Sequence, residues 1–165
     1  MNKSRKIVFG LGNTLNRDEG LGVYALKVLE TALAALKTDG QASSQDIELL
    51  DGGVLGLNLL PWVEESSHLL ILDAVSANKA PGAIVELSKQ EIPLYSGIKM
   101  SDHQVTFQEV LGIAQFRNRL PQNLHLIGAQ PADISIGVDL SVEVQNAIPQ
   151  IVRRAISQLE SWDLI

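Results

Sequence analysis

The sequence predicts an α/β fold: a single domain built on a twisted, mostly parallel sheet of five strands, with helices on both faces of the sheet. Short, continuous apolar runs recur along the chain, which is the pattern of strands that are buried on both faces. Segments of helical length separate these runs, and strands that alternate with helices favour a parallel sheet. The 165 residues contain no repeat, low-complexity tract or linker, so we expect one domain over residues 1–165.

Five apolar runs are the predicted strands, at residues 7–11, 47–50, 69–72, 83–87 and 124–127. The run 69–72, Leu-Leu-Ile-Leu, is the most apolar of them. We therefore expect it to be a central strand that ends at Asp73.

Four segments have the spacing of helices. Apolar residues recur every three or four positions over residues 21–36, and this pattern ends before Asp39 and Gly40. A short helix is expected at 55–63, limited or kinked by Pro61, and another at 106–117. The last apolar stripe covers residues 144–159 and contains Pro149. The helix either begins near this proline, which suits a first turn, or bends there.

Composition excludes several classes of function. The chain has no cysteine, so it has no disulfide, thiol nucleophile or iron–sulfur cluster, and a metal site must use oxygen and imidazole ligands. A net charge of -6 argues against binding to nucleic acid or anionic lipid. No apolar run approaches the roughly 18 residues of a membrane span. The basic residues 1–6 precede only a short apolar run, which we interpret as a strand and not as a signal peptide. We expect a cytoplasmic protein.

The glycine-rich segment 10–22 is the most informative part of the chain. It connects the first strand to the first helix, where other glycine-rich loops bind phosphate through backbone N–H groups. Here the loop carries Asp18 and Glu19, and carboxylates repel phosphate but attract a cation. A dinucleotide-binding loop would have a third glycine where this chain has Leu15. The loop therefore indicates a cation site.

Carboxylates follow three predicted strands: Glu19, Asp51 and Asp73. The carboxyl ends of strands are where ligands bind in α/β folds. Each carboxylate also has a structural explanation, because aspartate is frequent in turns and an acid in a first helical turn is favoured by the helix dipole. Asp73 is harder to explain in this way, because a carboxylate at the end of a buried strand needs a partner. That partner is either a ligand or a backbone N–H group.

Histidine can complete a metal site. His68 and His125 lie before and within predicted strands, and we interpret both as structural. His103 lies in a polar loop before the third long helix, where a histidine is more often solvent-exposed than a ligand. Together, Glu19, Asp73 and His103 form a plausible set of two carboxylates and one imidazole. Such a set holds a divalent transition metal and leaves coordination positions open.

The ordered motifs from residue 7 to residue 131 resemble the hydrogenase maturation proteases, the endopeptidases that trim the C-terminus of the nickel-iron hydrogenase large subunit. The motifs that carry the resemblance are Gly10-Leu11-Gly12-Asn13, Leu15, Asp18-Glu19-Gly20-Leu21-Gly22, Asp51-Gly52-Gly53 with Gly56, Asp73, and His103-Gln104. The chain departs from the family at Val54, where threonine is common, and at Ala132, where an acid is frequent. These departures concern contacts with the peptide or the choice of partner.

The resemblance implies a substrate and a role for each site residue. The partner is the large-subunit precursor, and the metal is nickel carried by that precursor, for which zinc or cadmium could substitute in a crystal. By position, Glu19, Asp73 and His103 match the metal-contacting residues. Asp18 or Asp51 could serve as a general base, and we include Asp51 among the catalytic candidates. Neighbours on a helix diverge by roughly a quarter turn, so Asp18 and Glu19 are not expected to face one ion. We expect a monomer.

Three other functions compete with this one. A metallopeptidase with its own zinc would be supported by His-Glu-x-x-His, which is absent from the chain. A non-proteolytic domain that binds a nucleotide or another ligand can be built on the same fold. An inactive binding partner is a third possibility, and the presence of Glu19, Asp73 and His103 together argues against it.

Overall fold

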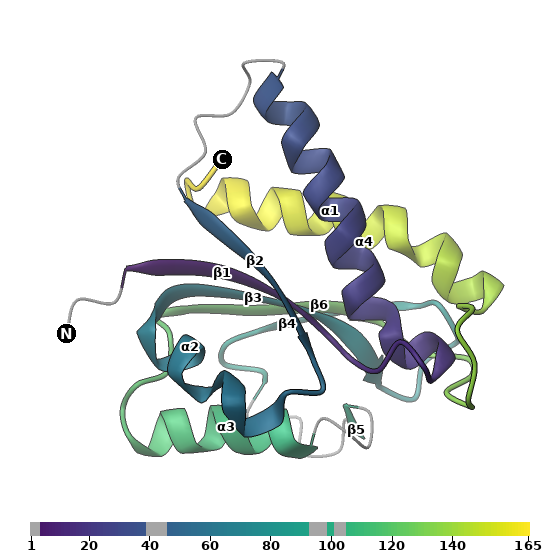
Figure 1. Cartoon of the computed structure of the whole chain (residues 1–165), viewed down its shortest axis with the longest axis horizontal. Coiled ribbons are helices and arrows are strands. Elements are labelled where there is room, and N and C mark those ends of the chain that lie inside the picture. Colours follow the sequence, from purple (N-terminus) through teal and green to yellow (C-terminus); the bar gives the residue numbers. More distant parts are fainter. Residues whose placement is uncertain (1–3, 39–45, 93–98, 101–104) are drawn as a thin grey trace.

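The computed structural model describes residues 4–38, 46–92, 99–100 and 105–165. Its sheet has five strands in the order β2-β1-β3-β6-β4, and a short sixth strand, β5, pairs with the end of β3. All neighbours in the five-stranded part are parallel except β4, which runs antiparallel to β6. Figure 1 shows this twisted sheet with helices on both faces. The predicted fold class is confirmed.

The elements follow one another along the chain in the predicted alternation. In order they are β1 (Arg5–Leu11), the 3-10 helix η1 (Arg17–Gly20), α1 (Leu21–Thr38), β2 (Ile47–Gly53), the 3-10 helix η2 (Gly56–Leu59), α2 (Leu60–Glu65), β3 (Ser66–Ser76), β4 (Ile84–Ser88), β5 (Lys99–Met100), α3 (Val105–Phe116), β6 (Asn123–Ala129) and α4 (Val142–Ser161). The predicted second helix is divided into η2 and α2, and Pro61 lies in the first turn of α2, where its missing N–H is tolerated.

Two hydrophobic layers lie on opposite faces of the sheet. Alternate strand residues such as Val8 and Leu70 pack with buried residues of α1 and α4. The intervening residues, such as Phe9 and Ile71, pack with α2 and α3. Both sets are buried, which explains why the strand sequences are apolar without alternation.

The central strand β3 is longer than predicted. We expected it to end at Asp73, but it continues through Ser76. Beyond Asp73 it pairs with β6 up to Ala74 and with β5 at Val75 and Ser76. The pairing of β1 with β3, by contrast, ends at Gly10 and Leu72. Asp73 is therefore an interior residue of β3, placed just past the point at which the neighbouring strand turns away.

The last helix passes through its proline. Of the two alternatives for Pro149, a helix start there is wrong, because α4 begins seven residues earlier at Val142 with Ser141 as its N-cap. The Ser141 hydroxyl accepts a hydrogen bond from the Val144 amide. Pro149 removes one intrahelical hydrogen bond, and the buried apolar side of α4 against the sheet compensates for that loss.

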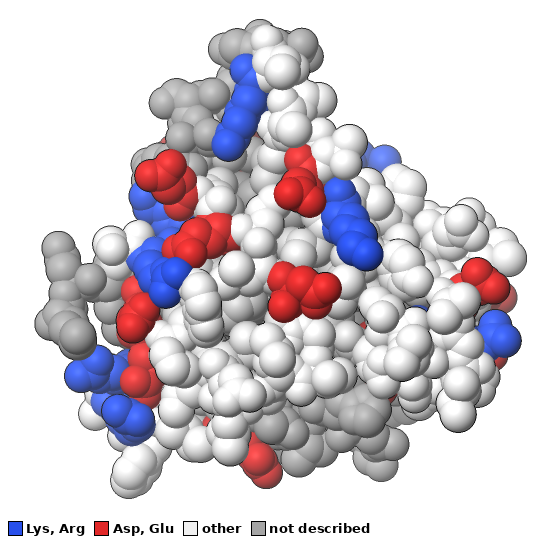
Figure 2. Space-filling model, in the orientation of Figure 1, with Lys and Arg blue, Asp and Glu red and all other residues white. Residues whose placement is uncertain are grey.

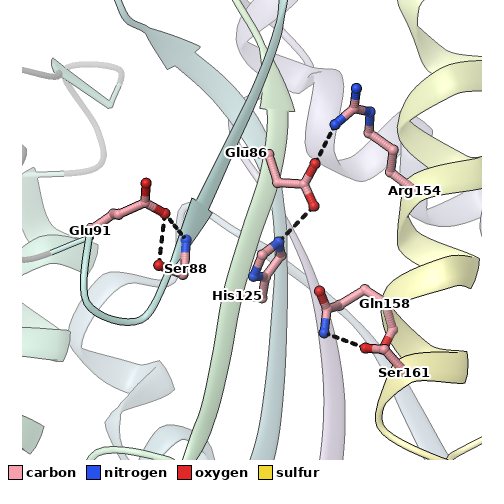
Figure 3. A network of polar contacts seen from close by, with 7 residues as sticks. All are labelled: Glu86, Ser88, Glu91, His125, Arg154, Gln158 and Ser161. Carbon is pink, nitrogen blue, oxygen red and sulfur yellow. Dashed lines mark hydrogen bonds and ion pairs between the residues drawn. The ribbon is translucent and has the colours of Figure 1, made fainter.

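One polar cluster fastens β4, β6 and α4 together. The Glu86 carboxylate on β4 lies between His125 of β6, at 2.8 Å, and Arg154 of α4 (Figure 3). His125 is thus a structural residue, as predicted. On the same face of the sheet, His68 of β3 contacts Asn123 of β6 and the ring of Trp162, which follows α4. In the described part of the chain, no helix combines the length and apolar character needed to cross a bilayer.

Candidate active site

The candidate site lies at the carboxyl ends of β1 and β3. The chain passes from β1 to α1 on one face of the sheet. The helix α3, which precedes β6 in the chain, packs on the other face. Such a divergence between neighbouring parallel strands opens a crevice at the sheet edge. Figure 1 shows the loop after β1 passing from the end of that strand into α1.

Glycines bring the start of α1 against the backbone of both strands. A Cβ atom at Gly22 would lie 2.1 Å from the carbonyl oxygen of Leu72 and 2.4 Å from that of Leu11. Gly12 has a φ of 112°, and a Cβ there would lie 1.7 Å from the carbonyl oxygen of Glu19. Because only glycine permits these approaches, the loop folds back and holds Glu19 at the ends of β1 and β3.

Asp18 is an anchor and not an open ligand. Its buried carboxylate accepts four hydrogen bonds: from the amides of Ala132 and Asp133 at 2.8 and 2.9 Å, and from the amide and hydroxyl of Ser141 at 2.7 and 2.8 Å. These bonds join η1 to the segment between β6 and α4. Because these four donors occupy its carboxylate, Asp18 is poorly suited to be a general base.

Glu19 and Asp73 lie near each other, and both are almost fully buried. Burial raises the pKa of Asp73 well above its ordinary value, and the charge of Glu19 raises it further, against the opposing effect of a 2.7 Å hydrogen bond from the Ala74 amide. The effect of Glu19 on the pKa of Asp73 indicates that the two carboxyl groups lie within electrostatic reach of each other. A pair of buried acids of this kind is favourable for a cation.

One oxygen of Asp73 is available for a ligand. Its Oδ1 accepts the Ala74 amide, whereas the buried Oδ2 accepts no hydrogen bond from the described residues. Native proteins rarely leave such an atom unsatisfied without a functional reason. Across the sheet, Asp73 faces Gly128 of β6, where a Cβ would lie 1.9 Å from the Asp73 carbonyl oxygen. The absence of a side chain at Gly128 thus allows β6 to approach the backbone of Asp73 closely.

Asp51 does not join this pair. It is exposed near the end of β2, and its Cα pairs with Gly10. Leu49 packs with the α1 and α4 layer, so alternation directs Asp51 to the same face. Asp73 is two residues after Ile71 and points to the face of α2 and α3. The two side chains are on opposite faces of the sheet.

His103 lies outside the described residues. The described neighbours in the chain are Met100, whose backbone pairs with Val75, and Val105, where α3 begins. In the described ranges, no group of three or more acidic, histidine or cysteine side chains is arranged to hold a metal ion.

The fold and the site together define the class of protein. It is an α/β domain with buried acids at its switch point, where a phosphate-binding domain would have unoccupied backbone N–H groups. A nucleotide phosphate at this edge would lie near the buried acids Glu19 and Asp73. This arrangement disfavours the nucleotide-binding alternative.

The chain belongs to the hydrogenase maturation protease family. The family model described as HycI, hydrogenase maturation protease, matches residues 32–158. The chain is 38% identical over 160 residues to the hydrogenase expression/formation protein HupD of Rhizobium leguminosarum bv. viciae, covering 96% of this chain and 75% of the relative. It is 31% identical to the hydrogenase 2 maturation protease of Escherichia coli (strain K12), covering 94% of this chain and 90% of the relative.

A solved structure has the same fold. The hydrogenase maturating endopeptidase HybD from Escherichia coli superposes with a TM-score of 0.82 at 30% sequence identity, covering 96% of this chain and 93% of the other. The agreement therefore extends to almost the whole chain, more than the residues 32–158 that the family model matches. The protein is thus a member of a family of endopeptidases.

Proposed function

We propose that this protein is an endopeptidase that removes the C-terminal extension of a nickel-iron hydrogenase large-subunit precursor after nickel has been inserted. Family membership supports the activity. The observation that supports the position of the site is the burial of Glu19 and Asp73 side by side at the carboxyl edge of the sheet. In this proposal nickel belongs to the substrate, and the protease recognises it.

The proposed contacts to nickel are Glu19, Asp73 and His103. The unsatisfied Oδ2 atom of Asp73 supports this assignment, because a cation there would satisfy it and would also relieve the repulsion between the two acids. Carboxylate and imidazole ligands both suit a first-row divalent metal. His103 is included because it follows Met100 by three residues, and Met100 pairs with β3 two residues beyond Asp73.

The proposed reaction is hydrolysis of one peptide bond. Water adds to the carbonyl carbon, the bond from carbon to nitrogen breaks, and the nitrogen leaves with a proton as the new amino group. Nickel in the substrate would polarise the carbonyl, activate the water or position the peptide. The sequence makes Asp51 a candidate base, but Asp51 and Asp73 lie on opposite faces of the sheet. In this proposal Asp51 therefore takes no part in the reaction.

The remaining expectations about the protein are part of the same proposal. Residues 1–165 act as one protease domain, as a monomer and in the cytoplasm, where the precursor is synthesised. The net charge of -6 supports a partner that is neither nucleic acid nor an anionic membrane surface.

The test uses the purified precursor in its nickel-free and nickel-loaded forms. We expect the wild-type protease to shorten only the loaded form, as measured by the loss of mass of the extension. Glu19→Gln, Asp73→Asn and His103→Ala should each stop this processing and leave the circular dichroism spectrum unchanged. Asp51→Asn is the matched control, because it neutralises an exposed acid at the same edge, and it should process at the wild-type rate.

Three results would each contradict part of the proposal. Equal processing of the nickel-free and the nickel-loaded precursor would show that the protease does not recognise nickel. Full activity of the double variant Glu19→Gln with Asp73→Asn would remove the ligand assignment, and loss of activity in Asp51→Asn would restore Asp51 as a catalytic residue.

A further inference from the structure

An exposed apolar surface borders the candidate site. We define the apolar rim as Leu15 in the loop after β1, together with Ile134, Ile136, Val138 and Val142 in and after the segment between β6 and α4. Each of these side chains is between 44% and 88% exposed. Single exposed apolar residues are ordinary, but a group of large ones on one surface marks an interaction site.

The two parts of the rim are joined by backbone hydrogen bonds. The amide of Gly137 donates to the Leu15 carbonyl at 2.9 Å, and the Arg17 amide donates to the Gly137 carbonyl at 2.8 Å. Because Ile136 and Val138 flank Gly137 in the chain, this bonding brings them beside Leu15. Residues that are far apart in the sequence thus form one surface.

The rim is held in a fixed shape. Asp18 binds the segment at both ends, and the Tyr24 hydroxyl donates to the Val138 carbonyl at 2.8 Å. A surface that is ordered before binding loses less conformational entropy when a partner covers it. Fixing the rim in advance therefore strengthens the binding of a partner. The same hydrogen bonds do not shield the rim from solvent in the free protein.

Few charges accompany the apolar rim, although Asp139 and Glu143, which directly follow Val138 and Val142 in the chain, are exposed. Arg17, next to the rim, is paired with Asp133 at 3.4 Å. Figure 2 shows charged side chains gathered on the left of the molecule, where the strands begin, whereas the right-hand part, where the loop after β1 and the segment before α4 lie, is largely uncharged with charges at its margin. Apolar contact, with few charges, is typical of the centre of a protein interface.

We propose that the apolar rim docks an apolar face of the folded hydrogenase large-subunit precursor beside the extension that is cleaved. This inference rests on the proposed function. The argument for the precursor is continuity: Leu15 is in the same loop as Glu19, so a protein that covers the rim also covers the edge with Glu19 and Asp73. A second copy of this chain would close the site against its substrate.

The experiment measures binding and processing separately. The double variant Leu15→Ser with Ile136→Ser is titrated against nickel-loaded precursor, and its KM and kcat for processing are determined. We expect the dissociation constant and KM to rise at least tenfold with kcat unchanged, the result of losing contacts that are equal in the ground and transition states. Phe116→Ser is the matched control, because Phe116 is 89% exposed at the far end of α3, and it should bind as the wild type does.

The outcomes separate this inference from the proposed function. Wild-type affinity in the double variant, or an equal loss in Phe116→Ser, would overturn the inference even if the precursor is processed. Binding that depends on the rim without any cleavage would support the rim and refute the proposed activity. A wild-type dimer that the double variant converts to a monomer, with unchanged affinity for the precursor, would assign the rim to a second copy and overturn the inference.

Discussion

Asp18→Ala tests whether the loop after β1 is held by its buried carboxylate. The substitution removes the acceptor of four hydrogen bonds, two from exposed residues 132–133 and two from Ser141. It does not alter the Glu19 side chain itself. We expect a large decrease in the free energy of unfolding, although none of the proposed metal ligands is changed.

The magnitude follows from the partners. A hydrogen bond to a charged group contributes about 1.5–3 kcal/mol, but water can reach the amides of the two exposed residues once Asp18 is gone, so we take about 1 kcal/mol for each of the four. The free energy of unfolding should then fall by about 4 kcal/mol. Because 1 kcal/mol shifts Tm by roughly 2–4 °C in a chain of this size, Tm should fall by about 12 °C.

The assay is thermal unfolding followed by circular dichroism. Asp18→Asn should fall between Ala and wild type, because the amide keeps one acceptor oxygen but turns an NH2 group toward the other donors. Asp51→Ala, an exposed acid, should stay within about 0.5 kcal/mol of wild type. A Tm for Asp18→Ala within 2 °C of wild type, roughly half a kcal/mol, would refute the anchoring role. Lost processing at an unchanged Tm would make Asp18 catalytic.

Three further predictions follow from burial, packing and charge. The pKa of Asp73 is raised by burial and by Glu19, so the folded state holds a proton that the unfolded state loses. The free energy of unfolding should therefore decrease above pH 3.8 by up to about 1.4 kcal/mol per pH unit. If Asp73→Asn keeps a slope of that size, the titration of Asp73 is not its cause. Gly22→Ala should cost about 3 kcal/mol and stop processing, whereas Gly112→Ala, whose Cβ meets nothing within 4 Å, should stabilise α3 by up to about 1 kcal/mol. Burial acts to raise the pKa of Glu86, but hydrogen bonds from its partners on β6 and α4 lower it overall. Glu86→Gln should therefore lower Tm by about 2–4 °C at pH 7, and this difference should disappear in acid as Glu86 is protonated; a difference that persists there would contradict the ion pair.

The sequence predicted the fold well because its pattern is simple. Continuous apolar runs and helical stripes each have one favourable arrangement, two helical layers around a parallel sheet. The errors occurred at single residues where tertiary contacts outweigh local preference. At Pro149 the sequence left a helix start and a bend as alternatives, and the start is wrong because the buried side of α4 carries the helix through the proline. Asp73 reads as the end of a strand, but pairing with β5 and β6 extends β3 beyond it.

The site was predictable in part. Local sequence placed Glu19 and Asp73 after neighbouring strands, and topology brings such residues together. The four bonds of Asp18 come from residues more than a hundred positions away, and no short motif indicates them. The face to which Asp51 points depends on the register of β2, which composition does not reveal. Ile136 and Val138 similarly resemble ordinary apolar loop residues until their 88% and 60% exposure is known.

The partners of Asp18 also determine when the protein becomes competent during its own synthesis. The loop after β1 leaves the ribosome early, but the amides and hydroxyl that fix it belong to residues 132–141 near the other end of the chain. Contacts of such long sequence separation form late in folding, because the entropy of a long loop must be lost first. A nascent chain shorter than residue 141 can assemble its sheet up to β6 but cannot lock the acid loop. The loop after β1 thus becomes fixed only after residues 132–141 have been synthesised.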